Sequence, residues 1–208
     1  MSAKPEVVVL GAGGAMGLAM SRNIARAGFP LCAWNRTREK ADPLAREGAR
    51  IVDSPSEAAQ AATGARIVMT MLSDTDTVLE VMVGEDGLLR GPEQDGLIWV
   101  QMTTIGVPGT EHCAELAQRH GLTFVDAPVI GGRGPAVRGE LIILASGPHH
   151  TRDAVQTLFE VVGKETIWVG PAGAGSSLAE AVPGPGEGDL AALLIANATG
   201  APNGSSRV

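Results

Sequence analysis

A glycine-rich segment at residues 11–17 has the most specific chemistry in this sequence. It reads Gly11-Ala12-Gly13-Gly14-Ala15-Met16-Gly17 and directly follows an apolar run at residues 7–10. Glycines let a chain turn tightly and approach a phosphate where a Cβ would clash, and the N–H groups of a following helix favour an anion. The segment predicts a diphosphate-binding turn. Its spacing is one residue longer than the strict Gly-x-Gly-x-x-Gly pattern, so a glycine-rich turn without a ligand is the alternative.

A second polar segment, Asn35-Arg36-Thr37, ends the next apolar run. In NAD-binding units an Asp or Glu at this place bonds the ribose 2′-OH. The neutral Asn35 removes the repulsion that a carboxylate would exert on a 2′-phosphate, and the Arg36 guanidinium can bond that phosphate in fork geometry. Arg38 and Lys40 follow closely. The segment therefore predicts NADP as the ligand, with NAD as the alternative.

Apolar runs that alternate with helical patterns place these two segments in a larger fold. We expect strands at residues 7–10, 31–34, 49–51, 66–70, 96–100, 122–126, 141–145 and 165–169. We expect helices at residues 15–27, 38–47, from 55 onward, 75–82, 108–119 and 151–162. Ser54 and Glu57 form a capping box for the helix that begins at Pro55. This alternation predicts an α/β fold, a Rossmann-type, doubly wound and mostly parallel sheet with helices on both faces.

The carboxyl ends of the strands are where ligands bind in such sheets. Besides the two segments above, those ends hold Leu72-Ser73, Thr103-Thr104 and the segment 126–132. After residue 170 the chain becomes rich in glycine and proline, and Pro183 and Pro185 break any helix. We therefore expect a dinucleotide-binding domain at residues 1–170 and a divergent tail at 171–208, with one or two helical turns at 190–196.

Composition excludes several classes of protein. The chain has 208 residues, 44% of them hydrophobic and 19% charged, which is typical of a globular domain. A net charge of −7 argues against nucleic-acid and anionic-membrane partners, and no apolar run approaches the length of a membrane span. The two cysteines, Cys32 and Cys113, lie far apart in apolar patterns, so we expect no disulfide framework and a cytoplasmic location.

The chain resembles the β-hydroxyacid dehydrogenase family, which includes 3-hydroxyisobutyrate dehydrogenase and the cofactor domain of 6-phosphogluconate dehydrogenase. Five segments in order carry the resemblance: 11–17 with Met20 and Asn23, then 34–37, 71–73, 103–105 and 126–132. The resemblance covers about residues 5–178 and includes the motif Asp126-Ala127-Pro128-Val129-Ile130-Gly131-Gly132. It implies a Rossmann-type domain, an all-helical domain that this chain would lack, and hydride transfer between NAD(P) and a small 3-hydroxy acid or the matching aldehyde or keto acid. It also implies homo-oligomers that pair largely through the helical domain.

The resemblance assigns further site residues. It implies that Met71, Leu72, Ser73, Thr77 and Thr104 contact the cofactor and that Thr103, Gly131 and Gly132 face the substrate. Ile130 stands where the family usually has a serine that bonds the substrate carboxylate. No metal site is expected.

The family's general acid/base has no counterpart in this chain. The resemblance places a Lys shortly after a Gly-x-Gly turn, here Gly173-Ala174-Gly175, but no Lys follows Lys164. Glu180 is the nearest ionisable residue, and we expect it to be a solvated helix residue. The catalytic residue is therefore unknown. An altered reading frame in the tail is one explanation. A non-catalytic NADP-binding module or truncated product, and an imine reductase-like enzyme that does without the Lys, are the alternative functions.

Overall fold

The computed structural model describes residues 4–61, 65–91 and 96–181. Six parallel strands form the main sheet in the order β3-β2-β1-β4-β5-β6. Their bounds are Glu6–Leu10 (β1), Leu31–Trp34 (β2), Arg50–Ile51 (β3), Ala65–Thr70 (β4), Ile98–Gln101 (β5) and Thr123–Asp126 (β6). The order reverses beside β1, and all six carboxyl ends lie at one edge. The expected doubly wound, mostly parallel Rossmann-type sheet is confirmed.

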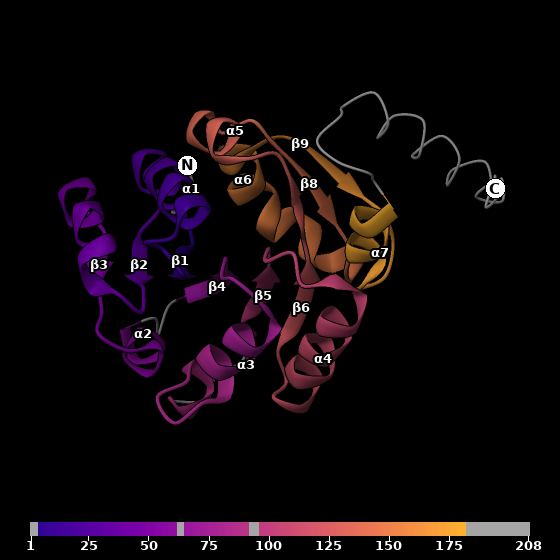
Figure 1. Ribbon diagram of the computed structural model, residues 1–208, viewed down its shortest axis with the longest axis horizontal. Helices are drawn as coiled ribbons and strands as arrows, with labels where there is room; N and C mark the ends of the chain where they lie inside the picture. The colour runs from indigo at the N-terminus through magenta and orange to yellow at the C-terminus, as the bar shows by residue number, and fades with distance from the viewer. Residues whose placement is uncertain (1–3, 62–64, 92–95, 182–208) are drawn as a thin grey trace, which may run out of the picture.

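Helices cover both faces of this sheet (Figure 1). One face carries α1 (Ala15–Arg26) and α6 (Arg152–Val162), and the other carries α2 (Pro55–Ala61), α3 (Thr75–Val83) and α4 (Gly106–Arg119). The central strands are apolar at successive positions because each residue faces one helical layer or the other. In β1, Val7 and Val9 pack into one core cluster while Val8 and Leu10 pack into the second.

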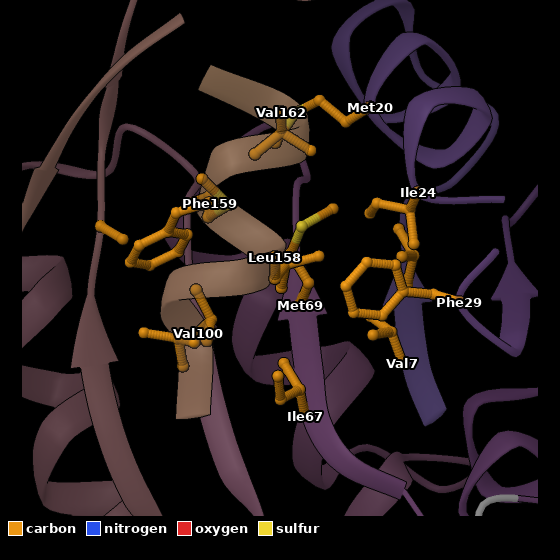
Figure 2. Close-up of a cluster of buried hydrophobic side chains, with 14 of the residues drawn as sticks. Val7, Met20, Ile24, Phe29, Ile67, Met69, Val100, Leu158, Phe159 and Val162 are labelled. Carbon is orange, nitrogen blue, oxygen red and sulfur yellow. The ribbon is translucent and has the colours of Figure 1, made fainter. Parts of the chain in front are cut away.

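The first core cluster joins α1 and α6 to the sheet (Figure 2). Met20 and Ile24 of α1 meet Leu158 and Val162 of α6 above the strand residue Met69. These side chains are fully buried. The packing fixes α1 against the sheet, so its N-terminus stays at the carboxyl end of β1.

A smaller three-stranded sheet extends the fold beyond β6. It has the order β7-β8-β9, with β7 (Val129–Ile130) antiparallel and β9 (Gly163–Trp168) parallel to β8 (Leu141–Ala145). Backbone bonds between Asp126 and Ser146 join it to the main sheet. One face of β8 packs on α6, and the other packs on α7 (Ala174–Ala181), which also contacts α4 and β6.

The structure differs from the sequence expectations in several elements. The single helix expected at 38–47 is two 3-10 helices, η1 (Arg38–Lys40) and η2 (Asp42–Glu47), with Pro43 at the start of the second. The segment after Asp126 contains β7 and then α5 (Arg133–Arg138), neither of which was expected. A further 3-10 helix, η3 (Leu88–Arg90), follows α3, and η4 (His149–Thr151) leads directly into α6. The helical turns expected at 190–196 lie outside the described residues.

Candidate functional site

A cavity of about 620 Å³ opens at the carboxyl ends of β1, β2 and β4. We call it the glycine-turn cavity. Twelve of the fourteen residues expected to bind the cofactor line it. They are Gly11, Gly14, Ala15, Met16, Gly17, Asn35, Arg36, Thr37, Met71, Leu72, Ser73 and Thr77. Of the other two, Gly13 lines a smaller neighbouring hollow of about 330 Å³ between α1 and α5, and Thr104 is exposed outside both.

Two glycines of the turn make approaches that no other residue allows. Gly11 has φ +96°, and a Cβ there would lie 2.2 Å from the Met71 carbonyl oxygen. A Cβ on Gly17 would lie 2.1 Å from the Gly11 carbonyl oxygen. These contacts bring the first turn of α1 down onto the end of β1 and beside β4, which is how the cavity obtains its floor.

The N-terminus of α1 faces this cavity without a side-chain cap from the described residues. Its N-cap is Gly14, none of these side chains bonds its first N–H groups, and the first turn has no acidic residue. The N–H groups of Ala15, Met16 and Gly17 therefore keep their donor capacity, and the helix dipole adds positive potential. All three residues line the cavity. The arrangement suits a bound anion.

Asn35 holds the turn to the segment that follows β2. The Gly13 N–H donates to Asn35 Oδ1 at 3.1 Å, and Asn35 Nδ2 donates to the Thr37 carbonyl oxygen at 2.8 Å. The side chain thus positions two cavity walls relative to each other. It is neutral, so the wall has no carboxylate at the position where an NAD-type site has one.

The cations near this wall differ in their surroundings. Arg36 and Lys40 line the cavity, and within the described ranges neither has an ion-pair partner within 4.0 Å. Arg38 does not line it. Its guanidinium pairs instead with Asp53 and, at 3.5 Å, with Asp42. Two cations rather than three are therefore available at the cavity.

The N-terminus of α3 borders the same cavity and is already occupied. Asp74 is its N-cap, and Asp74 Oδ1 accepts from the Thr77 N–H at 2.8 Å. The Ser73 hydroxyl, the Thr77 bonds and the charge of Arg36 hold the pKa of the Asp74 carboxyl below its ordinary value, so it is an anion at neutral pH. This helix end is not available to a second anion.

A buried polar chain fixes the wall at Leu72. The Leu72 N–H donates to Thr103 Oγ1 at 2.9 Å, and Gln101 bonds both the N–H and the carbonyl of Thr103. Thr103 is 1% exposed. In this conformation the Thr103 hydroxyl holds the cavity wall, and the role expected for it at the substrate stays a prediction.

The other residues expected at the substrate lie beyond β7. Gly131 and Gly132 are exposed at the start of α5, with Gly132 as its N-cap. Ile130, at the family's serine position, packs half-buried against Ile142, Leu144 and Leu178. Its side chain contributes to an apolar cluster and supplies no hydrogen-bond donor.

A buried carboxylate fixes the first turn of α7. Asp126, at the end of β6, accepts from the Ser176 N–H and hydroxyl, each at 2.8 Å, and from the Ser146 hydroxyl at 3.1 Å. Ser146 also accepts from the Gly175 N–H at 3.0 Å, and Ser176 bonds Thr110 of α4 at 2.8 Å. Burial outweighs these bonds and raises the pKa of Asp126 above its ordinary value.

Glu180 is a residue of α7, as the sequence predicted. It is exposed, but its Oε1 accepts from the Val107 N–H at 3.0 Å, at the N-terminus of α4. It is the one ionisable residue on α7 as described. Among the described residues of α7, no general acid or base is therefore free of structural bonds.

Sequence reasoning missed most of the far wall of the cavity. Trp34, Pro55, Glu80, Val81, Gly84, Glu85 and Asp86 line it as well. Residues 77, 80, 81 and 84 lie on one face at helical spacing. The expected cofactor contact of Thr77 could therefore have predicted that residues 80, 81 and 84 also line the cavity. The Asp126–Ser176 pairing spans 50 residues and had no local signal.

Several other kinds of site are absent from the part of the chain that the structure describes. No group of three or more His, Cys, Asp or Glu residues is arranged to hold a metal. No helix there combines the length and apolarity needed to cross a membrane. Burial raises the pKa of both the Cys32 and Cys113 thiols to about 12, so neither is a nucleophile at neutral pH.

Known proteins similar to this chain include NAD-binding domains, which agrees with a dinucleotide site at the glycine turn. The family model for the NAD binding domain of 6-phosphogluconate dehydrogenase matches residues 6–170. An uncharacterized oxidoreductase, YfjR of Bacillus subtilis, is 38% identical over 165 residues, which are 79% of this chain and 56% of that protein. Glyoxylate/succinic semialdehyde reductase 1 of Arabidopsis thaliana is 35% identical over 175 residues, 83% of this chain and 58% of that protein.

A solved structure resembles the whole described fold. The imine reductase from Myxococcus stipitatus in complex with NADP+ has a TM-score of 0.76 at 26% identity, covering 94% of this chain and 63% of that one. The chain spans a little over half the length of the two curated relatives. The glycine turn, its sheet and these matches together show that the chain belongs to the family of NAD-binding domains typified by 6-phosphogluconate dehydrogenase.

Proposed function

We propose that this domain binds NADP in the glycine-turn cavity. The observation that carries the proposal is the uncapped N-terminus of α1, which opens into a cavity whose next wall carries Arg36 and Lys40 but no carboxylate at Asn35. The N–H groups of residues 15–17 would hold the diphosphate, and the two cations the 2′-phosphate. Leu72, Ser73 and Thr77 would form the wall along the rest of the dinucleotide.

The residues present fit a dinucleotide at both charged positions. The turn is free of Cβ atoms where Gly11 and Gly17 meet neighbouring carbonyl groups, and the first helical turn contains no acid. Asp74 caps α3 with a negative charge, so anions are directed to α1. A bound nicotinamide accepts or donates hydride, and the protein's share is to bind, orient and exclude water.

We propose an oxidoreductase of the 3-hydroxyacid dehydrogenase type as the function of the site. Its substrates would be a small 3-hydroxy acid or the corresponding aldehyde or keto acid. The family assignment supports this class, and so does the likeness to a plant enzyme that is a glyoxylate and succinic semialdehyde reductase. Thr103, Thr104, Gly131 and Gly132 stay the predicted residues near the reacting end.

A second candidate is an NADP-binding module without hydroxy-acid turnover. It is favoured by α7, where the one ionisable side chain among the described residues is bonded to the Val107 N–H, so these residues supply no free group to move the substrate proton. An imine reductase-like activity is a third candidate, supported by the structural likeness to an imine reductase. Turnover assays with 3-hydroxy acids and with cyclic imines separate the three, because the module turns over neither.

The cofactor proposal is tested by NADPH and NADH fluorescence titrations of the purified chain. The wild type should bind NADPH more tightly than NADH. Arg36→Ala should weaken NADPH by about 10- to 100-fold, the loss expected for a charge-assisted contact, and leave NADH within about 2-fold. Arg46→Ala is the matched control, because Arg46 is an exposed residue of η2 that does not line the cavity. Equal losses for both cofactors in Arg36→Ala would place the 2′-phosphate elsewhere.

A further inference from the structure

The segment that follows β2 offers three cations, and the structure separates one of them from the other two. Arg36 and Lys40 line the glycine-turn cavity, whereas Arg38 lies between them in sequence and is outside it. Arg38 Nη1 pairs with Asp53 Oδ1, and its Nε lies 3.5 Å from Asp42 Oδ1. The side chain is held by two carboxylates, neither of which lines the cavity.

Asp53 is a well-anchored partner for this arginine. Its N–H donates to Glu57 Oε2 at 2.7 Å, and its carbonyl oxygen accepts from Trp34 Nε1 at 3.2 Å. The backbone is thus fixed at both groups, while the side chain is 76% exposed and free to meet Arg38. Trp34 lines the cavity, so Asp53 is bonded to a residue of the wall without lining the cavity itself.

We propose that Asp53 is a specificity-determining residue that limits the preference for NADP over NAD. The inference rests on the proposed binding of NADP in this cavity. Asp53 would weaken NADPH binding in two ways. Its ion pair holds the Arg38 guanidinium away from the 2′-phosphate, and its carboxylate adds a negative charge near the wall where that phosphate would bind. NADH has no 2′-phosphate for Arg38 to bond, so the effect on its affinity should be smaller.

The expected gain in NADPH affinity depends on how exposed Arg38 and Asp53 are. Arg38 is 44% exposed and Asp53 is 76% exposed, so their pairing is screened by water and salt. With Asp53 neutralised, Arg38 keeps only the exposed Asp42 as an ion-pair partner and can turn to a phosphate dianion, to which it can donate in fork geometry. The expected gain is therefore several-fold rather than hundreds-fold, and it should shrink as salt is raised.

The test is a double-mutant cycle on the full chain with Asp53→Asn and Arg38→Ala, read by NADPH and NADH titration. Asp53→Asn should tighten NADPH by about 3- to 5-fold, the range of an exposed ion pair, and leave NADH within about 2-fold. Arg38→Ala should change the NADPH Kd of the wild type by less than about 2-fold, and in the Asp53→Asn background it should remove most of the gain.

Glu39→Gln is the matched control, because it also removes one negative charge from the same exposed segment. Glu39 does not line the cavity and has no ion-pair partner within the described ranges. It should give a smaller change than Asp53→Asn, and thermal melts should show that every variant is folded.

The possible results separate a failure of the Asp53 inference from a failure of the proposed NADP binding. An NADPH Kd that is unchanged or weaker in Asp53→Asn overturns the inference, as does a control that gains equally or an Arg38→Ala loss as large as that of Arg36→Ala. In each of these cases NADPH still binds, so the proposed function stands. A wild-type chain that binds neither cofactor overturns the proposed function and this inference with it.

Discussion

The tripeptide Gly-Ala-Gly occurs twice in the chain, at residues 11–13 and 173–175. Each copy lies at the N-terminus of a helix, and the two N-termini differ in what bonds their N–H groups. The first precedes α1, whose N-terminus is bonded by no side chain and opens into the glycine-turn cavity. The second starts α7, where the Gly175 and Ser176 N–H groups already bond Ser146 and Asp126. One helix end is left for a ligand, and the other is filled by the protein's own carboxylate.

The glycines serve different purposes at the two ends. Gly11 is needed for its positive φ and for its contact with the Met71 carbonyl, which shape the cavity floor. A Cβ on Gly175 would lie 2.2 Å from the Leu144 carbonyl oxygen and 3.1 Å from Asp126, so that glycine lets α7 pack on β8. A glycine pattern thus predicts close approach. What fills the space is decided by residues distant in sequence.

The largest expected effect concerns the filled end. Asp126→Ala would leave the Ser176 N–H and two buried hydroxyl groups without their acceptor. The free energy of unfolding should fall by about 3–5 kcal/mol, measured by urea denaturation. Asp153→Ala, an exposed change on α6, is the control and should stay within about 0.5 kcal/mol of the wild type. A loss in Asp126→Ala no larger than that of the control would refute the role given to this carboxylate.

The next prediction converts the open end into a filled one. Gly14 has φ −66°, and a Cβ there meets nothing closer than the Gly11 carbonyl oxygen at 3.4 Å, so Gly14→Asp should fold. Its carboxylate would cap α1 as Asp74 caps α3 and compete with the diphosphate. NADPH affinity should fall by about 100-fold, measured by fluorescence titration. Gly14→Ala should bind within a few-fold of the wild type. Similar binding by the Asp variant would mean that α1 does not hold the anion.

The sequence predicted the fold around the open end of α1, but it contained no local signal for the bonds at the filled end of α7. The order of apolar runs predicted the parallel sheet, and Ser54 with Glu57 predicted the start of α2, where the Glu57 N–H bonds Ser54 Oγ at 3.0 Å. β7 and α5 have two and six residues, too few for a periodic pattern. The expected long helix became η1 and η2 because Pro43 has no N–H to continue it. Arg38 and Asp126 have partners 15 and 50 residues away, which no local pattern reveals.

A smaller effect on stability is expected at the N-terminus of α3, which Asp74 caps. Asp74→Ala removes the N-cap that bonds the Thr77 N–H, which should lower the free energy of unfolding by about 1 kcal/mol. Glu111→Ala on the exposed side of α4 is the control. A stability equal to that of the control would show that Asp74 is not an effective cap.

The smallest effect is a pH dependence at Asp126. Its pKa in the folded chain lies above its ordinary value of 3.8, so between these two values the folded state binds more protons than the unfolded chain. The contribution of this group to stability therefore rises as pH falls through that window. Relative to Asp126→Asn, the wild type should gain stability on acidification, measured by urea unfolding at a series of pH values. The opposite trend would mean that the hydrogen bonds outweigh burial.

The comparison between the two Gly-Ala-Gly turns is tested most directly by the backbone amide signals of the wild-type chain during an NADPH titration. Nitrogen-15 NMR should show large shifts for Ala15, Met16 and Gly17, whose N–H groups are open to the ligand, and little change for Gly175 and Ser176, whose N–H groups are already bonded. Saturation with NADPH without shifts at residues 15–17, or with the main shifts at Gly175 and Ser176, would contradict the account.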